Sequence, residues 1–153
     1  LARQQGLTIA AAESCTGGLV AAKLTSVPGA SDVFRGGIVA YDNDVKLAQL
    51  GVPDETLATH GAVSPETAAA MATGVRRSLG ADVAVAVTGI AGPGGGTAEK
   101  PVGLVDLDAS GPGAEIAREL SLPGDREAIR RRATAAALHL LRELLTHSRH
   151  TPA

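Results

Sequence analysis

The stretch Glu13-Ser14-Cys15-Thr16-Gly17-Gly18 joins a short apolar run to a segment whose apolar residues repeat at helical spacing. A serine at a strand-to-helix junction lies beside backbone N–H groups that have no partner within the helix. Such a position suits a nucleophile with an oxyanion site, or the binding of a phosphate. Ser14 and Thr16 are also ordinary N-cap residues. The stretch therefore fits a capped turn equally well, with Thr16 as the better cap and Glu13 orienting its neighbours or capping the turn.

Cys15 is a rival nucleophile, because a thiolate at a helix N-terminus has a lowered pKa. A small cysteine at the end of an apolar strand is more often a buried packing residue. It is the only cysteine, so neither an intrachain disulfide nor a cysteine-based zinc site can form. The four histidines show no metal-ligand spacing. We therefore expect no metal and no other cofactor.

A second polar group lies around Tyr41 and Lys46. The pattern predicts that Tyr41 ends a strand and that Lys46 lies near the start of the next short helix. If this strand neighbours the one that leads to Ser14, both polar ends meet at one edge of the sheet. A buried, neutral lysine there acts as a general base for a serine. The alternative is an exposed lysine on a surface helix.

Five glycines occur in the ten residues from Thr88 to Thr97. This loop follows the most apolar predicted strand, and it matches neither the Walker nor the dinucleotide fingerprint. Glycine lets a backbone approach a phosphate or an oxyanion closely. The loop is therefore either a flexible surface segment or one wall of an anion site.

Arg126 and Arg130 lie one helical turn apart and share one face of the predicted last helix. Two guanidinium groups on one face can clamp a phosphate through bidentate hydrogen bonds. Alternatively, they pair with Glu127 and other acidic residues nearby.

Composition limits the possible partners. The chain has 153 residues, 44% of them hydrophobic but only 1% aromatic, and a net charge of −2. Without a basic field or an aromatic stacking surface, we expect no nucleic-acid partner. No apolar run is long enough to span a membrane, and no secretory signal is visible. We expect a cytoplasmic protein that binds a small molecule, and a part of a longer protein because the chain begins with Leu1.

The elements that must position these residues alternate between strand and helix. The sequence predicts one α/β domain over residues 1–147, a three-layer α/β/α sandwich around one mixed β-sheet, and a frayed tail over residues 148–153. The long amphipathic last helix suggests a homo-oligomer, with a dimer as the expected form. Strands are predicted at Thr8–Ala12, Gly37–Tyr41, Val83–Thr88, Val102–Asp108 and Glu115–Leu122, and helices at Gly18–Ser26, Val45–Leu50, Pro53–Thr59, Pro65–Leu79 and Asp125–His147.

Taken in order, several stretches resemble the family of the CinA C-terminal domain, the competence/damage-inducible family that includes nicotinamide-nucleotide amidohydrolases (PncC). The resemblance covers roughly residues 7–145. The stretches that carry it are Ala12-Glu13-Ser14-Cys15-Thr16-Gly17-Gly18, Val27-Pro28-Gly29-Ala30-Ser31, Phe34-Arg35-Gly36-Gly37-Ile38-Val39-Ala40-Tyr41, Gly61-Ala62-Val63-Ser64 and Thr88-Gly89-Ile90-Ala91-Gly92-Pro93-Gly94-Gly95-Gly96-Thr97, followed by Glu99-Lys100-Pro101-Val102-Gly103.

The resemblance implies an enzyme that hydrolyses the carboxamide of nicotinamide mononucleotide to nicotinate mononucleotide and ammonia. It implies that Ser14 is the nucleophile and Lys46 the base, with Tyr41 close to both. The alternative is a non-catalytic nucleotide- or phosphate-binding regulatory domain of a larger protein. The residues expected to bind the substrate are Cys15, Thr16, Gly17, Gly18, Thr88, Gly89, Gly92, Gly94, Gly95 and one or both of Arg126 and Arg130.

Overall fold

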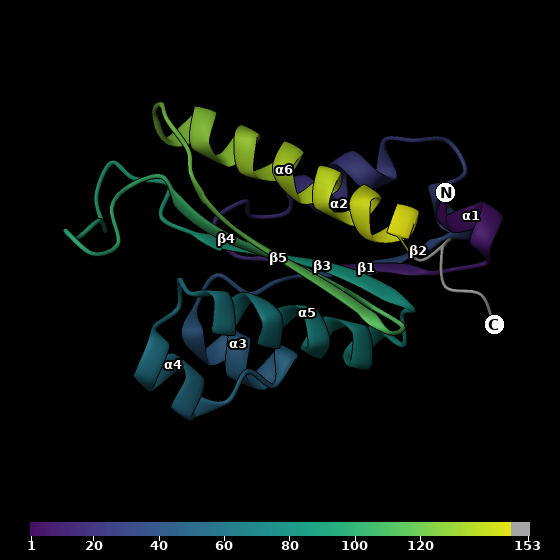
Figure 1. Ribbon diagram of the computed structural model, residues 1–153, viewed down its shortest axis with the longest axis horizontal. Coiled ribbons are helices and arrows are strands. Elements are labelled where there is room, and N and C mark those ends of the chain that lie inside the picture. Colours follow the sequence, from purple (N-terminus) through teal and green to yellow (C-terminus); the bar gives the residue numbers. More distant parts are fainter. Residues whose placement is uncertain (148–153) are drawn as a thin grey trace.

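The apolar run that begins at Val83 forms the central strand of a five-stranded sheet in the computed structural model, which describes residues 1–147 (Figure 1). Every residue from Val83 to Thr88 is buried, as expected for a strand that is covered on both faces. The strand order is β2-β1-β3-β4-β5. The strands are β1 (Ile9–Glu13), β2 (Phe34–Val39), β3 (Val83–Gly89), β4 (Leu104–Gly111) and β5 (Ala114–Ser121).

The sheet is mixed. β1 runs parallel to both β2 and β3, whereas β3–β4 and β4–β5 pair in the antiparallel direction. The carboxyl ends of β2, β1 and β3 therefore meet at one edge. In open α/β sheets, ligands bind at this edge.

Helices cover both faces of the sheet, which confirms the predicted three-layer α/β/α fold. Figure 1 shows α6 (Arg126–His147) and α2 (Leu19–Thr25) over one face, and α5 (Pro65–Leu79) with α3 (Asn43–Leu50) over the other. The helix α4 (Asp54–His60) packs against α5, and the short α1 (Ala2–Gln5) lies near one end of the sheet. A single 3₁₀ turn spans Ala30–Asp32.

The two long helices begin and end where the sequence predicts. Ser64 accepts a hydrogen bond from the Thr67 amide at the start of α5, and Gly80 ends that helix in a left-handed conformation. The stripe predicted for α6 is buried at Ile129, Ala133, Ala137, Leu140, Leu141 and Leu144, whereas Ala136 is only partly buried.

Two strands differ from the prediction by more than one residue at an end. β2 covers residues 34–39 rather than 37–41, because its pairing with β1 ends where Glu13 meets Val39. Tyr41 therefore lies in the loop after the strand and does not end it. β4 continues three residues beyond Asp108, since its hairpin with β5 keeps pairing to Gly111. The predicted tail over residues 148–153 lies outside the described residues.

Candidate active site

A small pocket of about 200 Å³ opens at the edge of the sheet where β1 and β3 end. It brings together residues that are far apart in the sequence, including half of the predicted site residues. Its lining consists of Ser14, Cys15, Tyr41, Lys46, Ala62, Val63, Thr88, Gly89, Ala91 and Arg126.

Ser14 and Lys46 meet inside this pocket. Lys46 Nζ lies 3.2 Å from Ser14 Oγ and 3.2 Å from the carbonyl oxygen of Tyr41. Ser14 directly follows β1, and Lys46 comes from α3, whose first turn is capped by the carboxylate of Asp42. The side chain of Lys46 is almost fully buried, at 1% exposure. The two groups are therefore within hydrogen-bond reach, away from bulk water.

Burial lowers the pKa of Lys46 below its usual 10.5, because a charged ammonium loses its hydration there. The carboxylate of Asp42 opposes this effect by attracting the charged form. Among the described residues, no carboxylate forms an ion pair with Lys46. Lys46 therefore loses its proton more easily than a lysine in water, as a base for Ser14 requires.

Tyr41 and Arg126 form the rim of the pocket. The ring of Tyr41 is exposed, and its hydroxyl accepts a hydrogen bond from Arg126 Nη2 at 2.9 Å. Arg126 Nη1 also donates to the carbonyl of Gly92 at 2.6 Å. Tyr41 meets Lys46 through its backbone carbonyl, so its hydroxyl is free to act at the pocket mouth with Arg126.

Cys15 is a poor candidate for the nucleophile. Burial raises the pKa of its thiol to about 11, because the desolvated thiolate is disfavoured. Burial thus outweighs the lowering that a helix N-terminus was expected to provide, and the thiol stays protonated near neutral pH.

Four predicted binding residues do not line this pocket, namely Thr16, Gly17, Gly18 and Arg130. The capping role expected for Thr16 is wrong, since its hydroxyl donates to Glu13 and the N-cap position of α2 is Gly18. Gly18 has φ of +110°, which only glycine adopts readily. The Glu13 carboxylate caps α2 in place of a side chain at the N-cap.

Only the beginning of the glycine-rich loop reaches the pocket. Thr88 and Gly89 line it, and the Thr88 hydroxyl donates to the Ala62 carbonyl at 2.6 Å. Gly92 takes part through its carbonyl, which Arg126 holds. Gly94 and Gly95 are exposed and lie outside the lining, so their contact with a substrate stays a prediction. The loop between β3 and β4 projects past the sheet, so its tip has little to pack against (Figure 1).

Three lining residues were not predicted: Ala62, Val63 and Ala91. Small apolar side chains without reactive groups give no chemical signal in a sequence. Lys100 holds this wall in place, since its ammonium donates to the carbonyls of His60 and Val63. In the sequence, only the position of Lys100 directly after the glycine-rich loop could have indicated that it supports this wall.

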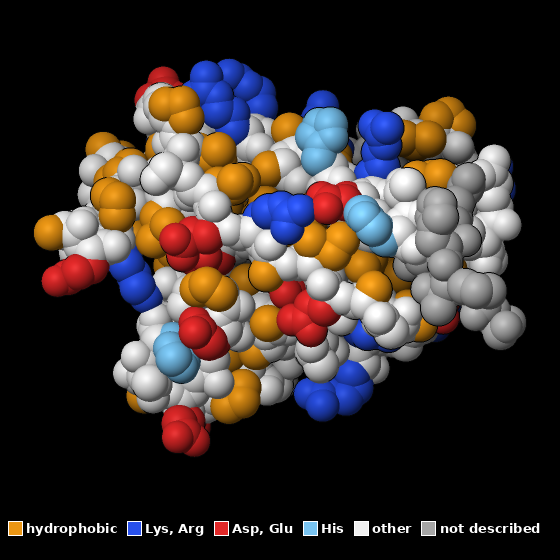
Figure 2. Space-filling model, in the orientation of Figure 1, with side chains coloured by type: hydrophobic (Ala, Val, Ile, Leu, Met, Phe, Trp, Pro, Cys, Tyr) orange, Lys and Arg blue, Asp and Glu red, His pale blue; other side chains and the backbone are white. Residues whose placement is uncertain are grey.

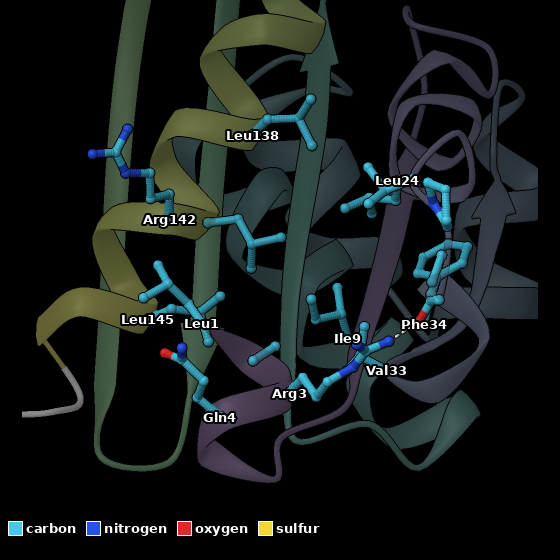
Figure 3. Close-up of a pocket in the computed structure, with 16 residues that line it drawn as sticks. Leu1, Arg3, Gln4, Ile9, Leu24, Val33, Phe34, Leu138, Arg142 and Leu145 are labelled. Carbon is cyan, nitrogen blue, oxygen red and sulfur yellow. Dashed lines mark hydrogen bonds between the residues drawn. The ribbon is translucent and has the colours of Figure 1, made fainter.

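The other pockets among the described residues do not combine a serine, a buried lysine and an arginine. The one in Figure 3, about 480 Å³ between α1, α6 and the segment after α2, is lined mainly by aliphatic side chains, with Arg3 already paired to Asp32. Within residues 1–147 we find no cluster of three metal-binding side chains and no helix fit to span a membrane. On the face in Figure 2, acidic and basic side chains are interspersed.

Comparison with known proteins assigns the chain to a family. The family model for the CinA C-terminal domain matches residues 1–145. The chain belongs to this family. A CinA-like protein of Kosmotoga olearia is 54% identical over 145 residues, which cover 95% of this chain and 35% of that protein. A putative competence-damage inducible protein of Moorella thermoacetica is 57% identical over 136 residues, 88% of this chain and 33% of that protein. The chain thus spans about a third of the length of these relatives.

Solved structures of the family share the fold. The competence/damage inducible protein CihA from Agrobacterium tumefaciens superposes with a TM-score of 0.91 at 48% identity, covering 94% of this chain and 88% of that chain. A CinA superfamily protein from Escherichia coli gives a TM-score of 0.90 at 33% identity, covering 94% and 83%. The predicted family and fold are therefore confirmed.

Proposed function

We propose that this domain is an amidohydrolase that deamidates nicotinamide mononucleotide through a serine acyl-enzyme. The observation that carries the proposal is the 3.2 Å contact between Ser14 Oγ and a buried Lys46 Nζ. A serine becomes a nucleophile when an adjacent base takes its proton, and the lowered pKa of Lys46 makes it such a base. A domain that only bound a nucleotide would not need this pair.

The reaction follows from these two groups. Neutral Lys46 takes the proton of Ser14 while Oγ bonds to the carboxamide carbon, which forms a tetrahedral oxyanion. As this intermediate collapses, the carbon–nitrogen bond breaks and protonated Lys46 gives its proton to the nitrogen, so that ammonia leaves. Lys46, neutral again, then deprotonates a water molecule that attacks the acyl-enzyme ester. When the second tetrahedral intermediate collapses, the carbon–Oγ bond breaks and protonated Lys46 returns its proton to Oγ, which releases the acid and restores the Ser14 hydroxyl.

The oxyanion needs hydrogen-bond donors that have no other partner. In the turn after Ser14, the Gly17 amide donates to the Ser14 carbonyl and the Gly18 amide donates to Glu13. Among the described residues, no other residue accepts from the amides of Cys15 and Thr16, and the Cys15 amide contacts only its own thiol. These two amides are the donors we assign to the oxyanion, and one such donor contributes about 3–4 kcal/mol to the transition state.

The surroundings suit a nucleotide whose amide-bearing ring enters the pocket. The pocket is small and takes only one end of such a molecule. Arg126 lines both this pocket and a larger groove between α2 and α6, whose other charged lining residues are Lys23, Glu127, Arg130 and Arg131. We place the ribose phosphate along this groove. The positive pyridinium ring beside Lys46 would disfavour a charged lysine and help to keep it a base.

The test is direct. The domain is incubated with nicotinamide mononucleotide, and ammonia and nicotinate mononucleotide are measured together. We expect equal amounts of both from the wild type and none above background from Ser14→Ala. Ser26→Ala, which removes an exposed hydroxyl on the far end of α2, is the matched control and should match the wild type. A wild type that binds the nucleotide without releasing ammonia would contradict the proposal and favour a regulatory binding domain.

A further inference from the structure

The turn of residues 14–18, here called the nucleophile turn, is held from two sides by charged side chains that do not line the pocket. Glu13 binds the turn where it leads into α2. Its Oε1 accepts from Thr16 Oγ1 at 2.6 Å, from the Val20 amide at 2.8 Å and from the Gly18 amide at 3.3 Å. Its Oε2 accepts from the Ala21 amide at 3.0 Å. A carboxylate that is 1% exposed thus satisfies the free amides at the start of α2.

Arg130, a residue of α6, binds the nucleophile turn through its backbone carbonyls. Its Nε donates to the Cys15 carbonyl at 3.0 Å, and its Nη2 donates to the Thr16 carbonyl at 3.2 Å. The guanidinium also packs closely against Gly17, where a Cβ atom would lie 3.2 Å from Nη2. Two N–H groups of one planar, permanently charged guanidinium therefore bind two successive backbone carbonyls.

The Arg130 contact sets the direction of the Thr16 amide, whereas the Gly17 amide, by donating to the Ser14 carbonyl, sets that of the Cys15 amide. In a trans peptide, the C=O and N–H of one unit point in opposite directions. Because Arg130 holds the Cys15 carbonyl, the Thr16 N–H of the same peptide unit points away from the guanidinium. The nucleophile turn is anchored at its start as well, since the Ser14 amide donates to the Val87 carbonyl at 2.9 Å.

We propose that Arg130 and Glu13 are positioning residues that orient the nucleophile turn, so that the Cys15 and Thr16 N–H groups bind the oxyanion. This inference rests on the proposed function. It also divides the two arginines of α6 by role. Arg126 lines the pocket itself, whereas Arg130 lines only the adjoining groove and acts on the nucleophile turn through its backbone carbonyls.

The division predicts different kinetic effects for the two arginines. A misdirected oxyanion donor stabilises the transition state less, while the binding of the substrate changes little. Arg130→Met should therefore lower kcat about 10²–10³-fold with little change in KM. Arg126→Met should mainly raise KM. Arg130→Lys keeps the charge but loses the two-pronged fork, and its kcat should lie between those of wild type and Arg130→Met.

A substrate-independent readout separates this inference from the proposed function. A fluorophosphonate reacts with an activated serine and places its phosphoryl oxygen in the oxyanion site, and intact-protein mass spectrometry gives the labelling rate of Ser14. We expect Arg130→Met to label about 10²-fold more slowly or worse, and the exposed Arg142→Met on the same helix to label like the wild type. Thermal unfolding of each variant checks that it is folded. If Arg130→Met does not fold, Arg130→Lys takes its place in the labelling experiment.

The outcomes are distinct. Wild type that labels at Ser14 but releases no ammonia contradicts the proposed substrate and leaves the positioning role standing if Arg130→Met labels slowly. Wild-type labelling and kcat in a folded Arg130 variant would overturn the positioning role. A raised KM with unchanged kcat would overturn it too, because that pattern marks a substrate contact. A wild type that neither labels nor releases ammonia refutes both.

Discussion

Lys46 is the side chain whose charge state decides whether this site can do chemistry. Two opposing influences act on it: burial lowers its pKa, and the Asp42 carboxylate raises it. Since the base must be neutral, the rate should rise with pH as Lys46 loses its proton. The acid side of the pH profile of kcat/KM therefore reports the pKa of Lys46 in the free enzyme.

Asp42→Asn should move this acid limb to lower pH. Removing the negative charge removes a stabiliser of the ammonium, so the pKa of Lys46 falls further and more lysine is neutral at a given pH. Asparagine still caps α3, where Asp42 accepts from the Asp44 amide at 2.8 Å, so the helix should keep its start. The measurement is kcat/KM against pH, with the exposed Asp44→Asn as the control. An unmoved limb in Asp42→Asn would argue against Lys46 as the base.

Cys15→Ala and Ser14→Ala should differ sharply. The thiol of Cys15, with a pKa of about 11, is protonated at neutral pH, and the proposed mechanism uses only the backbone amide of this residue. We expect Cys15→Ala to keep kcat within about tenfold, and Ser14→Ala to lose about three orders of magnitude or more. The ammonia assay measures both. The reverse ranking would make Cys15 the nucleophile.

Residue types and spacing raised a serine–lysine pair only as one of two alternatives, and the family resemblance assigned it. Neither separated the roles of the two arginines. Arg126 and Arg130 share one helix face by spacing, and only the packing of α6 shows that one reaches the pocket and the other reaches backbone carbonyls. The same holds for Glu13, which satisfies amides that lie five to eight residues further along the chain. Such contacts depend on the exact path of the turn.

At the scale of elements, α3 must dock closely on α5 for Lys46 to reach Ser14. The contact is made at Gly74 in the middle of α5, where a Cβ atom would lie 1.9 Å from the Leu50 carbonyl oxygen. Leu50 is the last residue of α3. A glycine inside a helix normally costs about 1 kcal/mol relative to alanine, so its presence here follows from the close approach of the two helices.

Gly74→Ala should therefore destabilise the protein although it improves helix propensity. Steric overlap with the end of α3 should cost about 1–3 kcal/mol in the free energy of unfolding and should shift Lys46 away from Ser14, lowering kcat. Urea denaturation and the ammonia assay measure the two effects. Thr73→Ala, at the exposed neighbouring position, is the matched control. A Gly74→Ala protein that is as stable and active as the control would contradict this close contact.

The strand and helix types of the main elements were predictable because apolar periodicity, Ser64-Pro65 and Gly80 mark them locally. Strand ends were less predictable, since pairing with a neighbour decides them. β2 stops where β1 stops, and β4 is extended by its hairpin with β5. The local sequence of a strand does not show which neighbouring strand it pairs with.

For the molecule as a whole, the antiparallel half of the sheet buries acidic side chains together. Asp106 and Asp108 on β4 are 1% and 0% exposed, and Asp106 is paired across the strands with Glu119. Burial, followed by the repulsion of Glu119, raises the pKa of Asp106 to about 6. Burial and Glu115 raise the pKa of Asp108 to about 7. Each aspartate therefore keeps its proton in the folded state at pH values where the unfolded chain loses it.

This difference fixes the sign of the pH dependence. Between about pH 4 and 7 the folded state binds more protons at these two sites than the unfolded state does, so their contribution to the free energy of unfolding falls as pH rises. Each tenfold difference in proton affinity corresponds to about 1.4 kcal/mol, so the loss is on the order of a few kcal/mol. Their contribution is complete below about pH 4 and is lost as pH rises through 6 to 7.

The double variant Asp106→Asn/Asp108→Asn should remove this loss, because asparagine resembles the protonated acid and does not titrate. We expect urea denaturation to show a variant that is more stable than the wild type at pH 8 and closer to it at pH 5. Asp54→Asn, an exposed acid at the start of α4, controls for the general loss of negative charge. If wild type and double variant change in parallel with pH, the two carboxyls are ionised in the folded protein, and the buried acidic strand must be stabilised by other groups.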